Sequence, residues 1–137
     1  MRKIVLISCV KSKLNHPALA RELYISPLFK FSLAYARSLN PDEIYILSAK
    51  YGLVELNQRI EPYELTLNKM SVNEVKAWSE RVISKLERLV NLEEDEIIFI
   101  AGQRYRQFLI SHITHYSVPL EGMSFGQQLR YMKAHTR

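Results

Sequence analysis

Three short, uninterrupted apolar runs constrain the fold of this chain more than any other feature. They cover residues 3–8, 43–48 and 96–101 and are rich in isoleucine, and a weaker fourth run covers residues 114–118. A strand with one face in water alternates polar and apolar residues, whereas an uninterrupted apolar strand has both faces covered, as in a parallel sheet. The sequence therefore predicts four strands, mostly parallel, inside an α/β domain.

Helical patterns separate these runs. Two helices are expected to begin with a capping box, in which a serine is followed three residues later by Glu or Gln. A third is expected to begin with Ser-Pro, because proline is well tolerated in the first turn of a helix. After Ser71, apolar residues recur at spacings of three and four, as they do on one face of a helix. The predicted helices cover residues 27–39, 72–91, 103–111 and 125–134.

Strands and helices alternate along the whole chain. This order predicts a three-layer α/β fold, in which a four-stranded, mostly parallel sheet has helices on both faces. A length of 137 residues is that of one ordinary domain, so we expect residues 1–137 to form a single α/β domain. Residues 54–70 have no clear period and are long for a connection, which is typical of functional segments in compact domains.

The cysteine count and the N-terminal sequence bear on the compartment. Cys9 is the only cysteine, which excludes an intramolecular disulfide and fits a reducing compartment. The first strand begins almost at Met1 without a signal-peptide pattern, and no apolar stretch reaches the roughly 18 residues of a membrane helix. We therefore expect a cytoplasmic protein with no membrane partner, whose oligomeric state the sequence leaves open.

Charge is distributed unevenly along the chain. Residues 1–41 carry seven Lys/Arg and one acid, residues 42–101 carry seven Lys/Arg and twelve acids, and residues 102–137 carry five Lys/Arg and one acid. If the two basic ends meet in space, they form a positive face that attracts phosphate-bearing ligands. A solvated surface of uneven charge is the alternative interpretation.

The loops after the strands are the expected binding site. Ligands of open parallel sheets bind outside the carboxyl ends of the strands, and glycines there allow a ligand to approach the backbone. The alternative for these glycines is a tight turn with no ligand. The ligand-binding candidates are Ser8, Cys9, Lys11, Ser12, Lys13, Ser48, Tyr51, Gly52, Tyr63, Gly102, Tyr105, Glu121, Gly122 and Gln127.

Known cofactor and metal patterns are missing from these loops. The first loop lacks the glycines of a P-loop, and the chain has no G-x-G-x-x-G, so neither a Walker nor a Rossmann site is supported and we expect no cofactor. The four histidines match no zinc spacing, so we expect no metal site. Cys9 has no base beside it in the sequence, which favours a buried structural cysteine over a nucleophile.

Candidate catalytic groups follow the second strand. Lys50 could bind phosphate, or act as a nucleophile if burial lowers its pKa. Glu61 and Glu64 are the candidates for a general base or a charge stabiliser, with Glu121 as a further carboxylate, although surface glutamates are common. Tyrosines in or beside the loops suit stacking on a nucleobase, with an ordinary domain surface as the alternative; they are Tyr24, Tyr51, Tyr63 and Tyr105.

Two stretches carry a family resemblance. Residues 47–54 (LSAKYGLV) and 60–65 (IEPYEL) resemble the YaaA family of bacterial peroxide-stress proteins, which has Leu-Ser-x-x-Tyr-Gly-Leu and then Pro-Tyr-x-Leu. Nearly the whole chain is similar to small bacterial and phage domains of unknown function, with Ser-Cys-x-Lys, Ser-Ala-Lys-Tyr-Gly-Leu and Pro-Leu-Glu-Gly-Met segments. Such domains look related to uracil-DNA glycosylases and to base-exchange enzymes of deazaguanine metabolism. The chain lacks the Asp-Pro-Tyr and His-Pro-Ser loops of uracil-DNA glycosylases, so their catalytic residues cannot be transferred.

The resemblance and the loops together lead to one hypothesis and two rivals. The first is a protein that processes a nucleobase in DNA or RNA, acting on an N-glycosidic bond as a glycosylase or base-exchange enzyme; a base in a duplex would have to be flipped out. The second is a non-catalytic nucleic-acid or nucleotide-binding module in stress response or phage defence. The third is an enzyme that uses the same loops on a free nucleotide or nucleobase.

Overall fold

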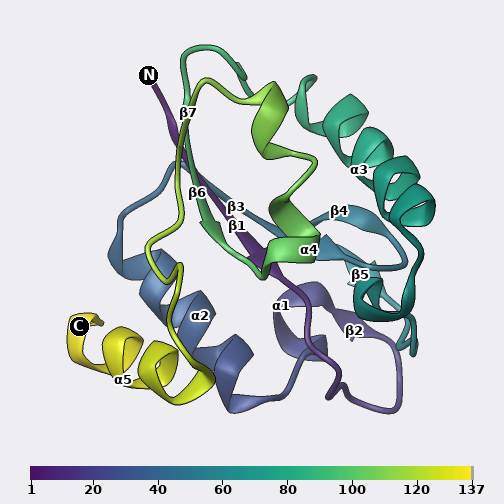
Figure 1. The fold of residues 1–137 in the computed structure, drawn as a ribbon. Helices are drawn as coiled ribbons and strands as arrows, with labels where there is room; N and C mark the ends of the chain where they lie inside the picture. The colour runs from purple at the N-terminus through teal and green to yellow at the C-terminus, as the bar shows by residue number, and fades with distance from the viewer. Residues whose placement is uncertain (137) are drawn as a thin grey trace.

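A five-stranded mixed sheet forms the centre of the molecule, in a computed structural model that describes residues 1–136 (Figure 1). The four expected strands are present and parallel, which confirms the α/β class. A fifth strand was not expected: the chain turns back at Gly52, whose φ is +74°, and pairs antiparallel along the edge. In spatial order the strands are β4 (Gly52–Glu55), β3 (Glu43–Ser48), β1 (Lys3–Ser8), β6 (Glu96–Ile100) and β7 (His115–Ser117).

The register places the ends of the central strands level with one another. Ser8 lies opposite Leu47 in the pairing of β1 with β3, and Ile7 lies opposite Ile100 in the pairing of β1 with β6. The loops that follow these strands therefore leave the sheet at the same edge, as parallel strands require.

Helices cover both faces of the sheet, as expected (Figure 1). On one face α2 packs against α5, and on the other α3 contacts β4 and α4. The α2–α5 contact joins segments from the two basic ends of the sequence, so these ends meet in space. The helices are α2 (Pro27–Ser38), α3 (Val72–Leu86), α4 (Gln103–Arg106) and α5 (Phe125–His135).

The helix starts follow the sequence more closely than the helix ends do. Ser26, Ser71 and Ser124 are N-caps, and the last two form capping boxes. By contrast, α3 ends at Leu86, before the expected residue 91, because the chain turns there toward β6. The expected helix 103–111 is interrupted after one turn and ends in a 3-10 turn at residues 110–112.

A small second sheet organises the segment that looked irregular. Strands β2 (Ala18–Leu19) and β5 (Arg59–Ile60) pair antiparallel, and the short helix α1 (Ala20–Leu23) follows β2. Backbone amides of Ala20 and Arg21 donate to the carbonyls of Gln58 and Leu56, at 2.8 and 3.0 Å. These contacts fix residues 56–63 beside the loop that follows β1.

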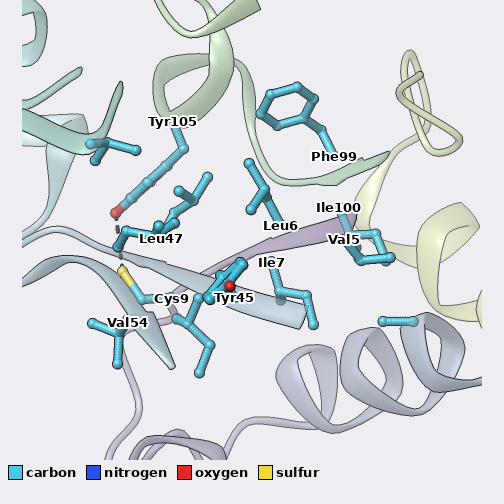
Figure 2. Close-up of a cluster of buried hydrophobic side chains, with 14 of the residues drawn as sticks. Val5, Leu6, Ile7, Cys9, Tyr45, Leu47, Val54, Phe99, Ile100 and Tyr105 are labelled. Atoms are coloured by element: carbon cyan, nitrogen blue, oxygen red, sulfur yellow. Dashed lines mark hydrogen bonds between the residues drawn. The ribbon is translucent and has the colours of Figure 1, made fainter. Parts of the chain in front are cut away.

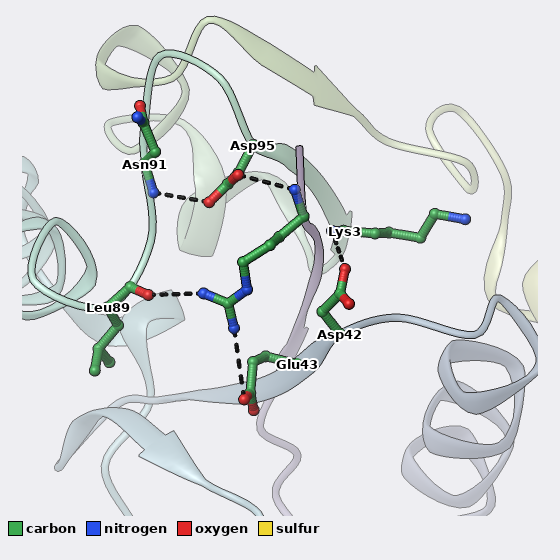
Figure 3. A network of polar contacts seen from close by, with 7 residues as sticks. Lys3, Asp42, Glu43, Leu89, Asn91 and Asp95 are labelled. Atoms are coloured by element: carbon green, nitrogen blue, oxygen red, sulfur yellow. Dashed lines mark hydrogen bonds and ion pairs between the residues drawn. The ribbon is translucent and has the colours of Figure 1, made fainter.

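The amino ends of the strands are tied together by carboxylates (Figure 3). Asp95 is only 5% exposed and accepts hydrogen bonds from the backbone amides of Arg2, at 2.9 Å, and Asn91, at 2.8 Å. These two bonds hold the pKa of Asp95 below its ordinary value. Asp42 accepts from the amide of Lys3 at 2.7 Å. This end of the sheet is closed by structural contacts and lies opposite the candidate site.

The interior is apolar on both faces of the sheet (Figure 2). Leu6 and Phe99 point to the side of α4, while Ile7 points to the side of α2, as alternation along a strand requires. Trp78 of α3 is fully buried. Among the helices of residues 1–136, none has the length and apolar character needed to cross a membrane.

Candidate functional site

The carboxyl end of β3 is held in place by a tryptophan. The ring nitrogen of Trp78 donates to the backbone carbonyl of Ser48 at 2.9 Å, across 30 residues of sequence. A buried tryptophan needs such a partner for its N–H. The bond therefore fixes the point at which the Ser48–Gly52 loop leaves the sheet.

A cluster of hydroxyl groups lies at this point, and we call Tyr24, Ser48 and Tyr63 the hydroxyl cluster. Ser48 donates to the Tyr63 hydroxyl at 2.8 Å, and the hydroxyls of Tyr63 and Tyr24 share a hydrogen bond of 2.7 Å. The Ser48 hydroxyl also accepts from the amide of Tyr51 at 3.0 Å. Burial raises the pKa of both phenols above the ordinary tyrosine value, so they remain neutral hydrogen-bonding groups near pH 7.

Cys9 adjoins this cluster from the end of β1. Its thiol donates to the hydroxyl of Tyr105 at 3.5 Å, which Figure 2 shows as a contact between the β1 loop and α4. The same hydroxyl accepts from the amide of Leu67 at 3.5 Å. Burial is the main reason that the pKa of Tyr105 is raised. Cys9 is 9% exposed, in keeping with the expected buried cysteine, and Tyr105 directs its hydroxyl into the interior.

Lys13 is the cation in closest contact with the cluster. Its amine lies 4.4 Å from the centre of the Tyr63 ring and 5.7 Å from that of Tyr24, and it donates to the carbonyl of Lys11 at 3.1 Å. Partial burial lowers its pKa, while the electrostatic influence of Cys9 and Glu64 acts in the opposite direction. The β1 loop therefore places a partly desolvated lysine against two phenol rings.

The groups expected to be catalytic lie farther out. Lys50 is exposed, with its amine 5.2 Å from the centre of the Tyr51 ring. The Tyr51 hydroxyl accepts from the amide of Glu61 at 3.3 Å, which joins the β3 loop to the segment after β5. Glu61 and Glu64 are themselves exposed. Both carboxylates thus lie on the segment that borders the hydroxyl cluster, on its solvent side.

The backbone fixes the positions of the other candidate residues in the loops after β1 and β6. Ser8 is half-buried at the end of β1, and Lys11 and Ser12 are exposed in the loop that follows. The carbonyl of Ser12 accepts from the amide of Ile25 at 3.0 Å. Gly102 is the N-cap of α4. At the start of the same loop the amide of Cys9 donates to the carbonyl of Leu47 at 3.0 Å, so the β1 loop is tied down at both of its ends.

Candidates after β7 make contacts of their own, apart from the hydroxyl cluster. Glu121 pairs with Arg106 at 3.6 Å, and Gly122 has a φ of +79°, which suits a turn without a side chain. Gln127 accepts from the amide of Ser124 at 2.8 Å in the capping box of α5. The structure therefore gives Glu121 an ion pair and Gln127 a capping contact.

Two supporting residues were missed by the sequence patterns. In the sequence, Trp78 is one of the apolar residues that recur after Ser71, and this spacing predicts only that it faces the core. Arg104 donates to the carbonyls of Leu67 and Met70, at 2.9 and 2.5 Å, and so anchors the end of the long segment after β5. A signal that could have found Arg104 is that the backbone carbonyls of a segment without regular secondary structure need hydrogen-bond donors, which an arginine can supply.

Two open hollows in the surface lie away from this site. One, of about 380 Å³, is lined by residues 41–45 and 55–57, and the other, of about 750 Å³, by residues 1–2, 87–93 and 95. The hydroxyl groups instead pack against one another. Within residues 1–136, no three His, Cys, Asp or Glu side chains are grouped as ligands for a metal ion.

Comparison with known proteins gives one match. Residues 4–134 match the model of a family described as "Family of unknown function (DUF6884)". No curated protein and no solved structure matches the chain. The match covers nearly the whole domain, including every loop of the candidate site.

Proposed function

This chain belongs to the DUF6884 family, whose function is unknown, and we propose that it is a nucleobase-processing protein that acts on the N-glycosidic bond of a base in DNA or RNA. The observation that carries the proposal is the chemistry gathered at the carboxyl ends of β1 and β3. Lysines, phenols and exposed carboxylates meet there, where parallel sheets bind ligands. The resemblance of residues 47–54 and 60–65 to the YaaA family, and of nearly the whole chain to small domains that look related to uracil-DNA glycosylases, supports the same substrate class.

Each group has a role in this proposal. Lys11 and Lys50 are exposed and bind phosphate oxygens. Tyr51 is half-buried and offers its ring for stacking, a role that the inward-facing Tyr105 is not placed to fill. Glu61 or Glu64 serves as general base, or stabilises positive charge that develops on the sugar as the bond to the base breaks.

The contact between α2 and α5 supports a polymer rather than a free nucleotide. Neither helix contains Asp or Glu. Lys30 and Arg37 are exposed on α2 and lie two turns apart, and Arg130 and Lys133 are exposed one turn apart on α5. A surface of this kind attracts a phosphodiester backbone.

Binding of single-stranded and duplex DNA and RNA at several salt concentrations tests the proposal. The wild type should bind with an affinity that falls steeply with salt, and Lys11→Ala/Lys50→Ala should weaken binding and reduce the slope of log K against log[salt] by about 2. The matched control is Lys76→Ala/Arg81→Ala, which removes the same charge from the exposed side of α3. Equal losses in both double variants, or no binding to any polymer, would contradict the proposed site.

A non-catalytic binding module is the second candidate, and the exposure of Glu61 and Glu64 favours it, because catalytic carboxylates usually sit in a pocket. Glu61→Gln/Glu64→Gln separates the two. For the enzyme, release of free base from an oligonucleotide should vanish while binding is kept. For the binding module, the wild type itself should release no base from any polymer that it binds.

A further inference from the structure

We propose that Lys13 is the covalent centre of this site, and that its side-chain amine forms an imine with the aldehyde carbon of a ring-opened sugar phosphate. The inference rests on the proposed function and deepens it. Hydrolysis of an N-glycosidic bond releases the base and leaves a sugar whose C1′ carbon is an aldehyde in the open form. An amine that faces the reacting sugar can capture this carbon.

The position of Lys13 is the first support. Its backbone pairs with Tyr24 in an isolated bridge, which holds the loop after β1 against the end of α1. Its amine reaches back over the ring of Tyr63, at 4.4 Å from the ring centre. Tyr63 is in turn bonded to Ser48 at the end of β3. The amine is therefore held at the strand ends by a rigid element on each side.

The surroundings of the amine are the second support. Lys13 is half-buried, whereas Lys11 and Lys50 are exposed. Burial disfavours the ammonium form, and this effect exceeds the opposing influence of Cys9 and Glu64, so the pKa of Lys13 is lowered. A lysine in this state presents more neutral amine near pH 7 than an ordinary surface lysine does, and the neutral amine is the nucleophile.

The reaction balances without an added oxidant or reductant. The lone pair of the Lys13 amine attacks the aldehyde carbon, and the carbonyl electron pair moves to oxygen, which takes up one of the two amine hydrogens as a proton. The second amine hydrogen is then lost as a proton, the oxygen leaves with both hydrogens as water, and a carbon–nitrogen double bond remains. The charge of Glu64 acts on the amine, and in the proposed step this carboxylate accepts and returns the proton through water.

Reductive trapping of the full-length protein tests the inference. The protein is incubated at pH 7 with ribose 5-phosphate and cyanoborohydride, and the labelled lysines are located by peptide mass spectrometry. Lys13 should be labelled at least about fivefold faster than Lys11, which lies two residues away in the same loop. Labelling of Lys13 no faster than Lys11 would overturn the inference, and this comparison needs no variant.

Variants and a second probe separate the inference from the proposed function. Lys13→Arg keeps the positive charge and should abolish rapid labelling, while Lys76→Arg, on the exposed side of α3, should leave it unchanged. The second probe is an oligonucleotide with an abasic site, reduced with borohydride in the presence of the protein. A cross-link at Lys13 supports both proposals. Selective labelling by ribose 5-phosphate without this cross-link supports the reactive lysine and overturns DNA as its substrate.

Discussion

The hydroxyl cluster gives the sharpest prediction about stability. Tyr63→Phe removes the hydroxyl that accepts from Ser48 at 2.8 Å and shares a bond of 2.7 Å with Tyr24. Ser48 and Tyr24 are 0% and 1% exposed, so water cannot replace the lost partner. A buried polar group left without a partner costs about 1–3 kcal/mol. We expect the free energy of unfolding to fall by about 2–4 kcal/mol, which allows for some rearrangement of the two hydroxyls.

Urea unfolding followed by tryptophan fluorescence measures this loss, because Trp78 is the only tryptophan and its ring nitrogen is bonded to the carbonyl of Ser48. The matched control is Tyr51→Phe, which removes a hydroxyl that lies nearer the surface and should cost less than about 1 kcal/mol. In the double variant Ser48→Ala/Tyr63→Phe, the loss should be smaller than the sum of the single losses. A loss for Tyr63→Phe no larger than that for Tyr51→Phe would refute the reasoning.

Three further changes test other parts of the structure by urea unfolding. Gly52→Ala should lower the free energy of unfolding by about 1–2 kcal/mol, because φ is +74° at Gly52 in the turn into β4. The control is Gly126→Ala on α5, where the added methyl group meets no neighbouring atom and should be neutral or slightly stabilising. Equal effects at the two glycines would contradict strain at the turn. Ser71→Ala should cost about 1 kcal/mol by removing the N-cap of α3, and the exposed Ser84→Ala within that helix less than about 0.5 kcal/mol; a larger loss at Ser84 would argue against capping. Two backbone hydrogen bonds lower the pKa of Asp95 in the folded state. Its contribution to stability is therefore present above the pKa of about 3.9 that it has in the unfolded chain, and it is lost as the pH falls through the lower pKa of the folded state. Asp95→Asn should flatten this acid-induced loss, and an unchanged profile between about pH 5 and 2 would contradict it.

Patterns that repeat within a few residues predicted most of the fold. The parallel strands and the three serine caps depend on neighbouring residues, and they were found within one or two positions of their places. Strands β2, β4 and β5 were not predicted. They are two to four residues long and gain their hydrogen bonds only from partners elsewhere in the chain. Such short strands have no period that a sequence can show.

The sequence likewise predicted only part of the candidate site. The rule for parallel sheets was sufficient to choose the loops after β1 and β3, because it needs only the order of the elements. It could not rank their residues. Lys50 and Lys13 both looked like phosphate ligands in the sequence, and the fold makes one an exposed side chain and the other a half-buried amine over a phenol ring.

The sequence by itself determined the α/β class, the positions of the parallel strands and the helix starts, because apolar runs and caps act through local geometry. Tertiary structure alone decided that Cys9 meets Tyr105, 96 residues away, and that Tyr63 meets Ser48 and Tyr24. The contacts of Tyr63 depend on how the small sheet of β2 and β5 folds residues 56–63 against the β1 loop. A hydrogen bond between distant residues is set by the packing of the whole chain, and no spacing within the sequence encodes it.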